Sequence, residues 1–351
     1  MNHMRVVFAC LIMFNVTSVV WAGEQELSGA GATFPDPLYV RMFDAYHRQF
    51  GVKVNYQPIG SGGGIQQLIN KTVDFGGTDA YMTHEETKQA GADVLHIPTC
   101  LGAVTVTYNL PGDPEIKLTP DAIAGIFLRK VTKWDDPQIA KTNAGVKLPS
   151  RRIIVVHRSD GSGTTFIFSD YLSKISKEWK DTIGCGKSLS WPRDTLGGQG
   201  NAGVAGIVTN TTYSIGYVEL TYALANRMPV AVIQNRSGNF IKPSPQSVTA
   251  AARVDIPADT KASITDAAAP DAYPISGFTW LIFYKEQSYK GRTVERAREL
   301  VKLMSWIIHE GQAFPEALHY APLPQEVVKK AEAILSSVVY GGTPIAVQQI
   351  Q

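Results

Sequence analysis

The sequence predicts an α/β protein with two lobes, and three observations support this prediction. First, its 351 residues exceed the roughly 250 to 300 residues at which a single core stops growing. Second, from Glu24 onward short β-rich segments alternate with amphipathic segments, which is the pattern of layered α/β folds. Third, no Pro- or Ser-rich linker divides the chain. We therefore expect lobes joined by more than one crossing segment.

The expected elements follow one another along the chain. Strand-like alternation covers residues 52–57, and helical patterns cover 35–50 and 65–70. The apolar run 153–156 leads through a turn into a helix. Residues 274–284 have the pattern of a strand, and 293–309 repeat apolar residues with the 3.6-residue period of a packed helix. The β-rich stretches 94–108 and 273–284 are the best candidates for the two crossings.

Composition and charge argue against a nucleic-acid partner. The chain is 44% hydrophobic and 18% charged, as in an ordinary globular protein, and its net charge is only +2. It has no cluster of Lys and Arg interleaved with aromatic residues that could follow a phosphate backbone. Any anion site must therefore be local.

The N-terminus has the pattern of a secretory signal peptide. Arg5 precedes an apolar stretch, and the small residue Ala22 marks the expected cleavage point. A membrane anchor is the alternative, but the apolar stretch is short and interrupted by Asn15, Thr17 and Ser18. We expect residues 1–22 to be removed from a secreted, periplasmic protein. Two cysteines then remain, Cys100 and Cys185, and either a disulfide or two separate thiols fits.

The stretch HRSDGSGTTF, residues 157–166, is a strand-to-helix turn suited to binding an anion. A helix start leaves backbone N–H groups unpaired and carries partial positive charge. Ser162, Gly163 and Thr164 supply hydroxyls and accessible amides there, and Arg158 can add a two-pronged guanidinium. Asp160 is placed to orient that guanidinium.

Two further stretches repeat the arrangement. GAGATFPDPLY puts Thr33 and Phe34 directly before a helix that begins around Pro35, and IGSGGGIQQLI opens a helix with Ser61. Each motif alone is more often a plain helix cap. Three in one chain, one with an arginine, favour a shared anion site.

The fourth stretch, DFGGTDAYMT, places Asp79 at the end of a short strand. By itself Asp79 is best explained as a turn or cap residue for the helix that opens near Thr83. Beside an anion site, its carboxylate would repel a fully ionised ligand. It would accept a hydrogen bond from an anion that carries a proton, as phosphate does near neutral pH and sulfate does not.

With these residues the sequence resembles the periplasmic phosphate-binding proteins of bacterial high-affinity phosphate ABC transporters. The resemblance runs through nearly the whole chain, in the order GAGATFP, VNYQPIGSGGG, TVDFGGTDA, KWDDPQIAK, HRSDGSGTTF, SLSWP, GGQGNAGVAG and SIGYVE. It departs from the family pattern at Gly62 and Thr78, where serine is usual.

The resemblance implies a two-lobed periplasmic-binding-protein architecture, type II-like, with a ligand cleft between the lobes and two hinge crossings. Residues 23–102 plus 276–351 would form one lobe, and residues 103–275 the other. The implied partners are inorganic phosphate and the membrane permease and ATPase subunits of an importer. We expect a monomer without cofactor or metal. The implied phosphate contacts are Thr33, Phe34, Ser61, Asp79, Arg158, Ser162, Gly163 and Thr164.

Two alternatives remain at the level of sequence, a hydrolase and a binding protein for a different anion, and a third is excluded. A secreted phosphoester hydrolase would need an activated serine, yet HRSDGSGTTF is not a nucleophile elbow and the histidines have no metal-ligand spacing. A nucleotide loop is excluded at Gly186-Lys187-Ser188, because the required first glycine is Asp181. Binding of another oxyanion or of an organic phosphate would use the same fold. Asp79 argues against sulfate and molybdate.

Overall fold

The structure, a computed structural model, describes residues 26–346. The expected signal peptide, residues 1–22, lies outside the described residues. The main sheet has eight strands in the order β2-β1-β3-β11-β4-β8-β6-β7. Their bounds are β1 Glu26–Gly31, β2 Lys53–Pro58, β3 Phe75–Thr78, β4 Val94–Tyr108, β6 Ile154–Arg158, β7 Leu196–Gly198, β8 Ser214–Glu219 and β11 Ser276–Tyr284.

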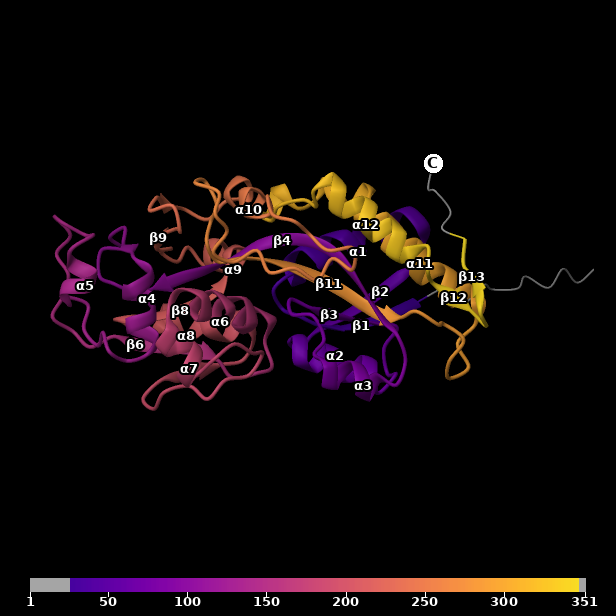
Figure 1. The fold of residues 1–351 in the computed structure, drawn as a ribbon, viewed down its shortest axis with the longest axis horizontal. Coiled ribbons are helices and arrows are strands. Elements are labelled where there is room, and N and C mark those ends of the chain that lie inside the picture. The colour runs from indigo at the N-terminus through magenta and orange to yellow at the C-terminus, as the bar shows by residue number, and fades with distance from the viewer. Residues whose placement is uncertain (1–25, 347–351) are drawn as a thin grey trace, which may run out of the picture.

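Strand β4 connects the two halves of this sheet. Its first part, Val94 to Ala103, pairs antiparallel with β11, and its last part, Val104 to Tyr108, pairs antiparallel with β8. In Figure 1 β4 and β11 lie along the long axis, between elements around β1 to β3 and elements around β6 to β8. We call these two groups the first and the second lobe. The two crossing segments expected from the sequence are present as β4 and β11.

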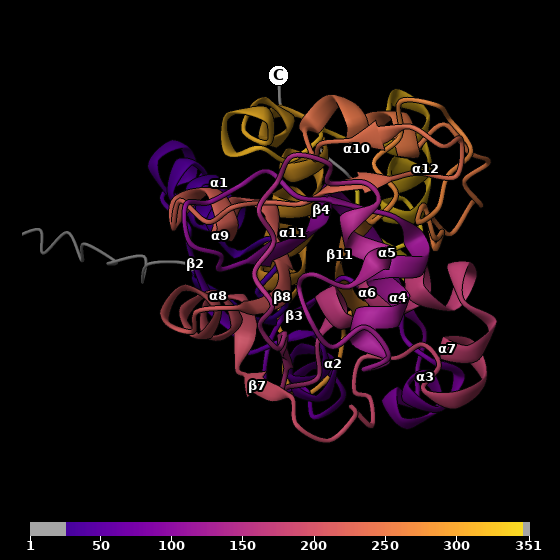
Figure 2. The ribbon, with the colours of Figure 1, turned by 90° about the vertical axis from the view of Figure 1, so that its left-hand side faces the viewer.

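Helices cover both lobes (Figure 1). The first lobe carries α1 Asp36–Phe50, α2 Ser61–Ile69, α3 His84–Ala90, α11 Val294–Ile308, α12 Gln325–Leu335, the 3-10 turns Glu310–Ala313 and Glu316–Leu318, and the hairpin β12 Val339–Tyr340 with β13 Thr343–Pro344. The second lobe carries α4 Pro120–Phe127, α5 Pro137–Ala140, α6 Gly163–Ile175, α7 Lys177–Thr182, α8 Gly200–Asn210, α9 Leu220–Ala225, α10 Pro245–Ala251 and the small sheet β5 Lys117–Leu118, β9 Val232–Gln234 and β10 Phe240–Ile241. Figure 2 views the molecule from the second-lobe end, with α4 to α6 in front of β11.

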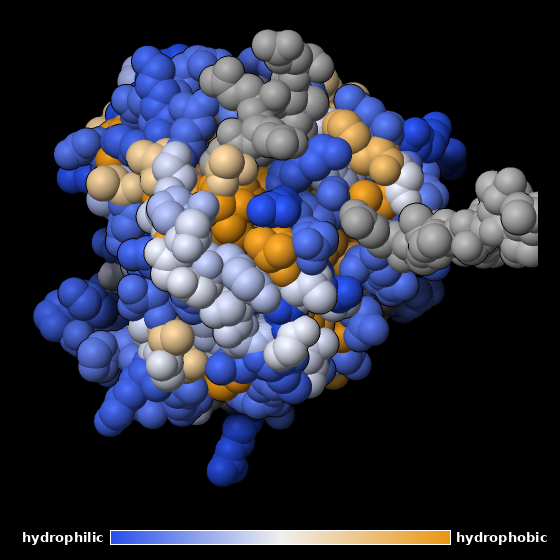
Figure 3. Space-filling model, turned by 90° about the vertical axis from the view of Figure 1, so that its right-hand side faces the viewer, coloured by the Kyte–Doolittle hydropathy of each residue, from blue (hydrophilic) through white to orange (hydrophobic). Residues whose placement is uncertain are grey.

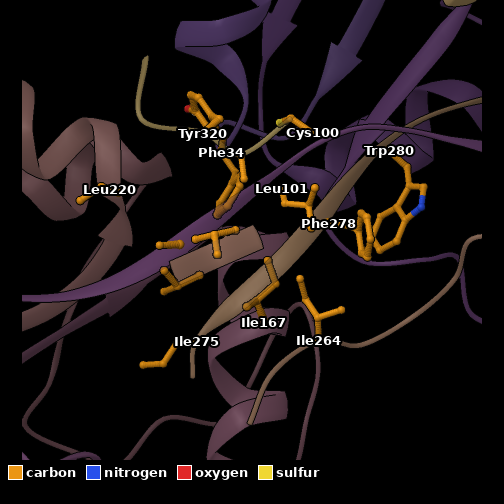
Figure 4. Close-up of a cluster of buried hydrophobic side chains, with 14 of the residues drawn as sticks. Phe34, Cys100, Leu101, Ile167, Leu220, Ile264, Ile275, Phe278, Trp280 and Tyr320 are labelled. Carbon is orange, nitrogen blue, oxygen red and sulfur yellow. The ribbon is translucent and has the colours of Figure 1, made fainter. Parts of the chain in front are cut away.

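The hydrophobic core is continuous across the crossing strands. Phe34 and Tyr320 meet edge to face, with ring centroids 6.2 Å apart, above β4 (Figure 4). Gly102 on β4 makes room for the Phe34 ring, since a Cβ at this glycine would lie 2.6 Å from it. Ile167 of α6 packs on Gly277 of β11 in the same way. Core packing therefore fixes the segment that carries Phe34 and the helix that follows Ser162.

The described elements agree with the sequence predictions. The periodic pattern indicated a helix only over 65–70, and the glycine-rich motif placed its start at Ser61, where α2 begins. Its first turn is rich in glycine and shows no amphipathic signal. Gly64 lets α2 approach β1, because a Cβ there would lie 2.5 Å from the carbonyl oxygen of Ala30. The open question on Cys100 and Cys185 is resolved in the structure, where both are free thiols.

Candidate functional site

The predicted site residues come together where the two lobes meet. Thr33 and Phe34 connect β1 to α1, Ser61 is the first residue of α2, and Asp79 follows β3, all in the first lobe. Arg158 ends β6 and Ser162 is the N-cap of α6, in the second lobe. The implied contacts are buried throughout, with Thr33 the most accessible at 7%. Three helix starts and one strand-end aspartate therefore converge at a closed interface.

The lobes contact each other through backbone atoms beside the site. The amide of Gly62 donates to the carbonyl of Gly161 over 2.8 Å. A Cβ at Gly62 would lie 3.1 Å from the Gly161 Cα. Serine, the usual residue at position 62 in the family, would need a small shift of one lobe here. Glycine at this position permits the present close approach.

Arg158 is held by Asp160 and keeps donors free. Its Nε donates to Asp160 Oδ1 at 2.8 Å, and its Nη2 donates to Oδ2 at 2.5 Å. Its Nη1 donates to Thr164 Oγ1 at 3.1 Å. Within residues 26–346 these bonds use three of the five N–H groups that a guanidinium has. One N–H therefore remains on each terminal nitrogen, which is the geometry for a two-point contact with an oxyanion.

The Asp160 carboxylate is set up for this orienting role. It also accepts a hydrogen bond from the Gly200 amide, at 3.0 Å. Burial raises the pKa of Asp160, but the hydrogen bonds and charge of Arg158 outweigh burial and bring this pKa below its usual value. The carboxylate therefore stays ionised and fixes the plane of the guanidinium. This is the geometry predicted from the sequence.

Ser61 links two predicted contacts on opposite lobes. Its Oγ accepts hydrogen bonds from the amides of Gly163, at 3.1 Å, and Asp79, at 3.2 Å. A hydroxyl has one proton and two acceptor positions, so Ser61 can only donate, either to the neighbouring Asp79 carboxyl or to a ligand. The Gly163 amide, expected to face the anion, is paired with Ser61 here. A bound anion would compete with Ser61 for it.

The Asp79 carboxyl is buried beside these groups. Thr279 of β11 donates to its Oδ1 at 2.7 Å. Burial raises the pKa of Asp79 to about 7, although Thr279, the charge of Arg158 and Ser61 act in the opposite direction. Gly163 lies against it, since a Cβ on that glycine would come within 2.5 Å of both Asp79 and Ser61. Near neutral pH this carboxyl can hold or share a proton.

Ser162 caps α6, and Thr33 and Phe34 are anchored by their carbonyl groups. Ser162 Oγ accepts from the amide of Thr165 at 3.0 Å. Tyr222 Oη donates to the Thr33 carbonyl and Tyr320 Oη to the Phe34 carbonyl, both at 2.7 Å. With the carbonyls engaged, the loop before α1 keeps one orientation.

His157 lies beside this site but is engaged by other groups. His157 Nδ1 lies 2.9 Å from the Arg158 carbonyl oxygen, and its ring stacks on Trp191 with centroids 4.7 Å apart. Within residues 26–346 no hydrogen bond joins His157 to Ser61 or Ser162. Over the same residues no three His, Cys, Asp or Glu side chains are grouped to hold a metal ion.

A separate groove lies at the end of the first lobe that carries α11 and the β12–β13 hairpin. Figure 3 views this end of the molecule, where apolar groups appear among hydrophilic ones. Its volume is about 720 Å³, and Val294, Lys302 and Tyr340 are among its lining residues. None of the predicted contacts lines it. The predicted site is therefore distinct from this groove.

Comparison with known proteins places this arrangement in a family. The model of the PBP superfamily domain matches residues 19–310. The phosphate-binding protein PstS of Pasteurella multocida is 42% identical over 327 residues, which cover 92% of this chain and 93% of the relative. The chain belongs to the PstS family of phosphate-binding proteins. PstS of Haemophilus influenzae is 40% identical over 313 residues, covering 88% of this chain and 92% of the relative.

Solved structures share the fold. A periplasmic phosphate-binding protein, PfluDING, bound with phosphate, has a TM-score of 0.71 at 22% identity, covering 88% of this chain and 93% of that one. A putative phosphate ABC transporter substrate-binding protein with bound phosphate from Clostridium perfringens has a TM-score of 0.63 at 18% identity, covering 86% and 100%. The resemblance to the PstS family and the two-lobed periplasmic-binding-protein architecture, both expected from the sequence, are confirmed.

Two polar residues that the sequence patterns did not indicate also lie at this candidate site. Thr279 stands within the apolar strand pattern of residues 274–284, where a lone threonine gives no signal. Asn201 occurs in the motif GGQGNAGVAG, which supported the resemblance but received no role. Its side chain bonds to both Thr33 and Thr164.

The second departure from the family pattern is Thr78, where serine is usual. Threonine keeps the hydroxyl, which accepts a hydrogen bond from the Ala80 amide at 3.1 Å and shapes the turn around Asp79.

Within residues 26–346 no helix is long and apolar enough to cross a membrane.

Proposed function

We propose that this protein is a periplasmic solute-binding protein that captures inorganic phosphate and delivers it to an ABC-type importer. The observation that carries the proposal is that a buried guanidinium, Arg158, and a buried carboxyl, Asp79, lie on opposite sides of one closed interface. The charge of Arg158 suits a phosphate oxyanion, and Asp79 suits its proton. Membership in the PstS family supports the same ligand.

In this account each lobe contributes part of the phosphate shell. The first lobe supplies the backbone amide near Phe34, the hydroxyls of Thr33 and Ser61, and the Asp79 carboxyl. The second lobe supplies the two remaining N–H groups of Arg158 and the start of α6, where Ser162, Gly163 and Thr164 lie. A dehydrated oxyanion at a helix start is stabilised by the helix dipole and by unpaired amides. Capture then requires one lobe to close upon the other, by bending of β4 and β11 where these strands pass between the lobes.

We further propose the lobe boundaries and the partners. Residues 23–102 with 276–351 form one lobe and residues 103–275 the other. One residue past this boundary, between Ala103 and Val104, β4 changes its pairing partner from β11 to β8, which supports the division. The mature chain begins near Gly23 in the periplasm and acts as a monomer. Its partners are the membrane permease and the ATPase subunits of the importer. It carries no catalytic function of its own.

Titration calorimetry of the phosphate-stripped mature protein against a panel of oxyanions tests the proposal. The panel contains phosphate, sulfate, molybdate and a phosphate monoester. We expect tight binding of phosphate and weak binding of the others. Tighter binding of the monoester would identify a different ligand. Release of phosphate from the monoester, abolished by Ser162→Ala, would instead establish a hydrolase.

A further inference from the structure

Asn201 is a fully buried residue in the first turn of α8, and its carboxamide has a fixed orientation. Its Oδ1 accepts a hydrogen bond from the backbone amide of Glu219 at 3.0 Å. A backbone N–H can only donate, so the oxygen of the carboxamide must face Glu219. The Nδ2 group, with its two protons, therefore faces the interface between the lobes.

The two Nδ2 protons go to two hydroxyls on opposite lobes. Asn201 Nδ2 donates to Thr33 Oγ1 at 2.8 Å and to Thr164 Oγ1 at 3.2 Å. Each hydroxyl receives a second donor as well. The Asn201 amide lies 3.3 Å from Thr33 Oγ1, and Arg158 Nη1 lies 3.1 Å from Thr164 Oγ1.

These contacts determine what both hydroxyls can do. A threonine hydroxyl has one proton and two acceptor positions. Protein donors occupy both acceptor positions of Thr33 and of Thr164. The single proton of each hydroxyl is then left for donation to another group. Neither hydroxyl can accept a proton from a ligand without breaking one of these bonds.

We propose that Asn201 is a positioning residue that turns the Thr33 and Thr164 hydroxyls into obligate donors to the bound anion. The inference rests on the proposed function, since the anion is phosphate. These hydroxyls then require unprotonated oxygens, whereas Asp79 takes the oxygen that carries the proton. Asn201 thereby fixes which phosphate oxygens face which part of the site. Because Thr33 belongs to the first lobe, its bond to Asn201 forms only on closure.

A double-mutant cycle on phosphate affinity tests this role. Asn201→Leu removes both donors without adding charge, and Thr33→Val removes the hydroxyl at nearly constant shape. In the wild-type background we expect Asn201→Leu to weaken phosphate binding roughly 10-fold, mainly through faster dissociation. In the Thr33→Val background the same change should cost no more than about 3-fold, because only Thr164 remains to be oriented. A merely structural role would give equal losses in both backgrounds.

A matched control uses another buried asparagine with two donated bonds. Asn235 Nδ2 donates to the carbonyls of Pro270 and Ala272, away from the candidate site. Asn235→Leu should leave phosphate affinity unchanged. If Asn201→Leu does not fold, Asn201→Ala enters the same cycle with the same expected non-additivity. Additive losses in a protein that binds phosphate would overturn the role of Asn201 alone. A wild-type protein that does not bind phosphate would overturn the proposed function itself.

Discussion

The Ser61 hydroxyl lies 3.1 Å from the amide of Gly163 and joins the first turns of two helices separated by 102 positions in the sequence. One helix belongs to each lobe. The same oxygen accepts from the Asp79 amide. This one hydroxyl therefore links the closed arrangement of the lobes to the position of the carboxyl that we assign to the phosphate proton.

Replacing Ser61 by alanine should weaken phosphate binding strongly. The change removes one donor to the anion and leaves the amides of Gly163 and Asp79 without their acceptor. A hydrogen bond to a charged group contributes about 1.5 to 3 kcal/mol, so we expect an increase in Kd of roughly 10- to 150-fold by calorimetry. Ser173 of α6 is the control, since its buried Oγ has no hydrogen-bond partner among the described residues. Equal affinity of Ser61→Ala and Ser173→Ala would refute this role.

Arg158→Lys should also reduce affinity although it keeps the positive charge. An ammonium cannot supply a planar two-point contact, and it cannot keep the paired bonds to Asp160. We expect a loss of about 10- to 150-fold in Kd. Arg152→Lys is the matched control, because Arg152 pairs with Asp194 at the exposed surface. An unchanged Kd for Arg158→Lys would remove Arg158 from the site.

An ion pair between the lobes should slow phosphate release. Lys187 Nζ in the second lobe lies 2.8 Å from Glu86 Oε2 of α3 in the first lobe, and both side chains are largely buried. Lys187→Met breaks this contact but keeps most of the side-chain volume. We expect the dissociation rate of phosphate, measured by stopped flow, to rise about 5-fold with little change in the association rate. Lys130→Met, which breaks a pair with Glu178 inside the second lobe, should leave both rates unchanged.

The fold could be predicted from the sequence because its strands and helices carry strong periodic patterns. The α11 helix and the β11 strand were predicted to within two residues, since burial on one helix face or on both strand faces leaves a pattern. The periodic pattern covered only residues 65–70 of α2, because the glycines of its first turn present no side chains. Its start at Ser61 came from the glycine-rich motif instead.

The site was predictable in its parts but not in its connections. The glycine-rich turns, Arg158 and Asp79 carry local chemistry that a sequence shows. The bonds of Asn201 and Thr279 and the pair of Lys187 with Glu86 join residues far apart in the chain. Such contacts depend on how the lobes close, and no local pattern encodes them.

Asp79 should make the stability of the phosphate-stripped protein depend on pH. The pKa of Asp79 is about 7 in the folded protein, whereas the ordinary value for an aspartate, which applies in the unfolded chain, is 3.8. Between these values the folded state holds a proton that the unfolded state has lost, so the free energy of unfolding falls as pH rises through this window. Asp79→Asn should remove the fall and be the more stable protein above about pH 7. Urea unfolding of both proteins across this range measures the effect, and parallel curves would contradict it.

Competition between phosphate and sulfate in the wild type and in Asp79→Asn, at fixed pH and salt, tests the central claim most directly. Phosphate can share its proton with Asp79, whereas sulfate would leave a buried acceptor unpaired. We expect the wild type to favour phosphate by about 10⁴-fold or more. Asp79→Asn should bind phosphate with modestly changed affinity and should lose much of its rejection of sulfate. If sulfate competes within about tenfold of phosphate in the wild type, or if the variant rejects sulfate as strongly, Asp79 does not read the ligand proton.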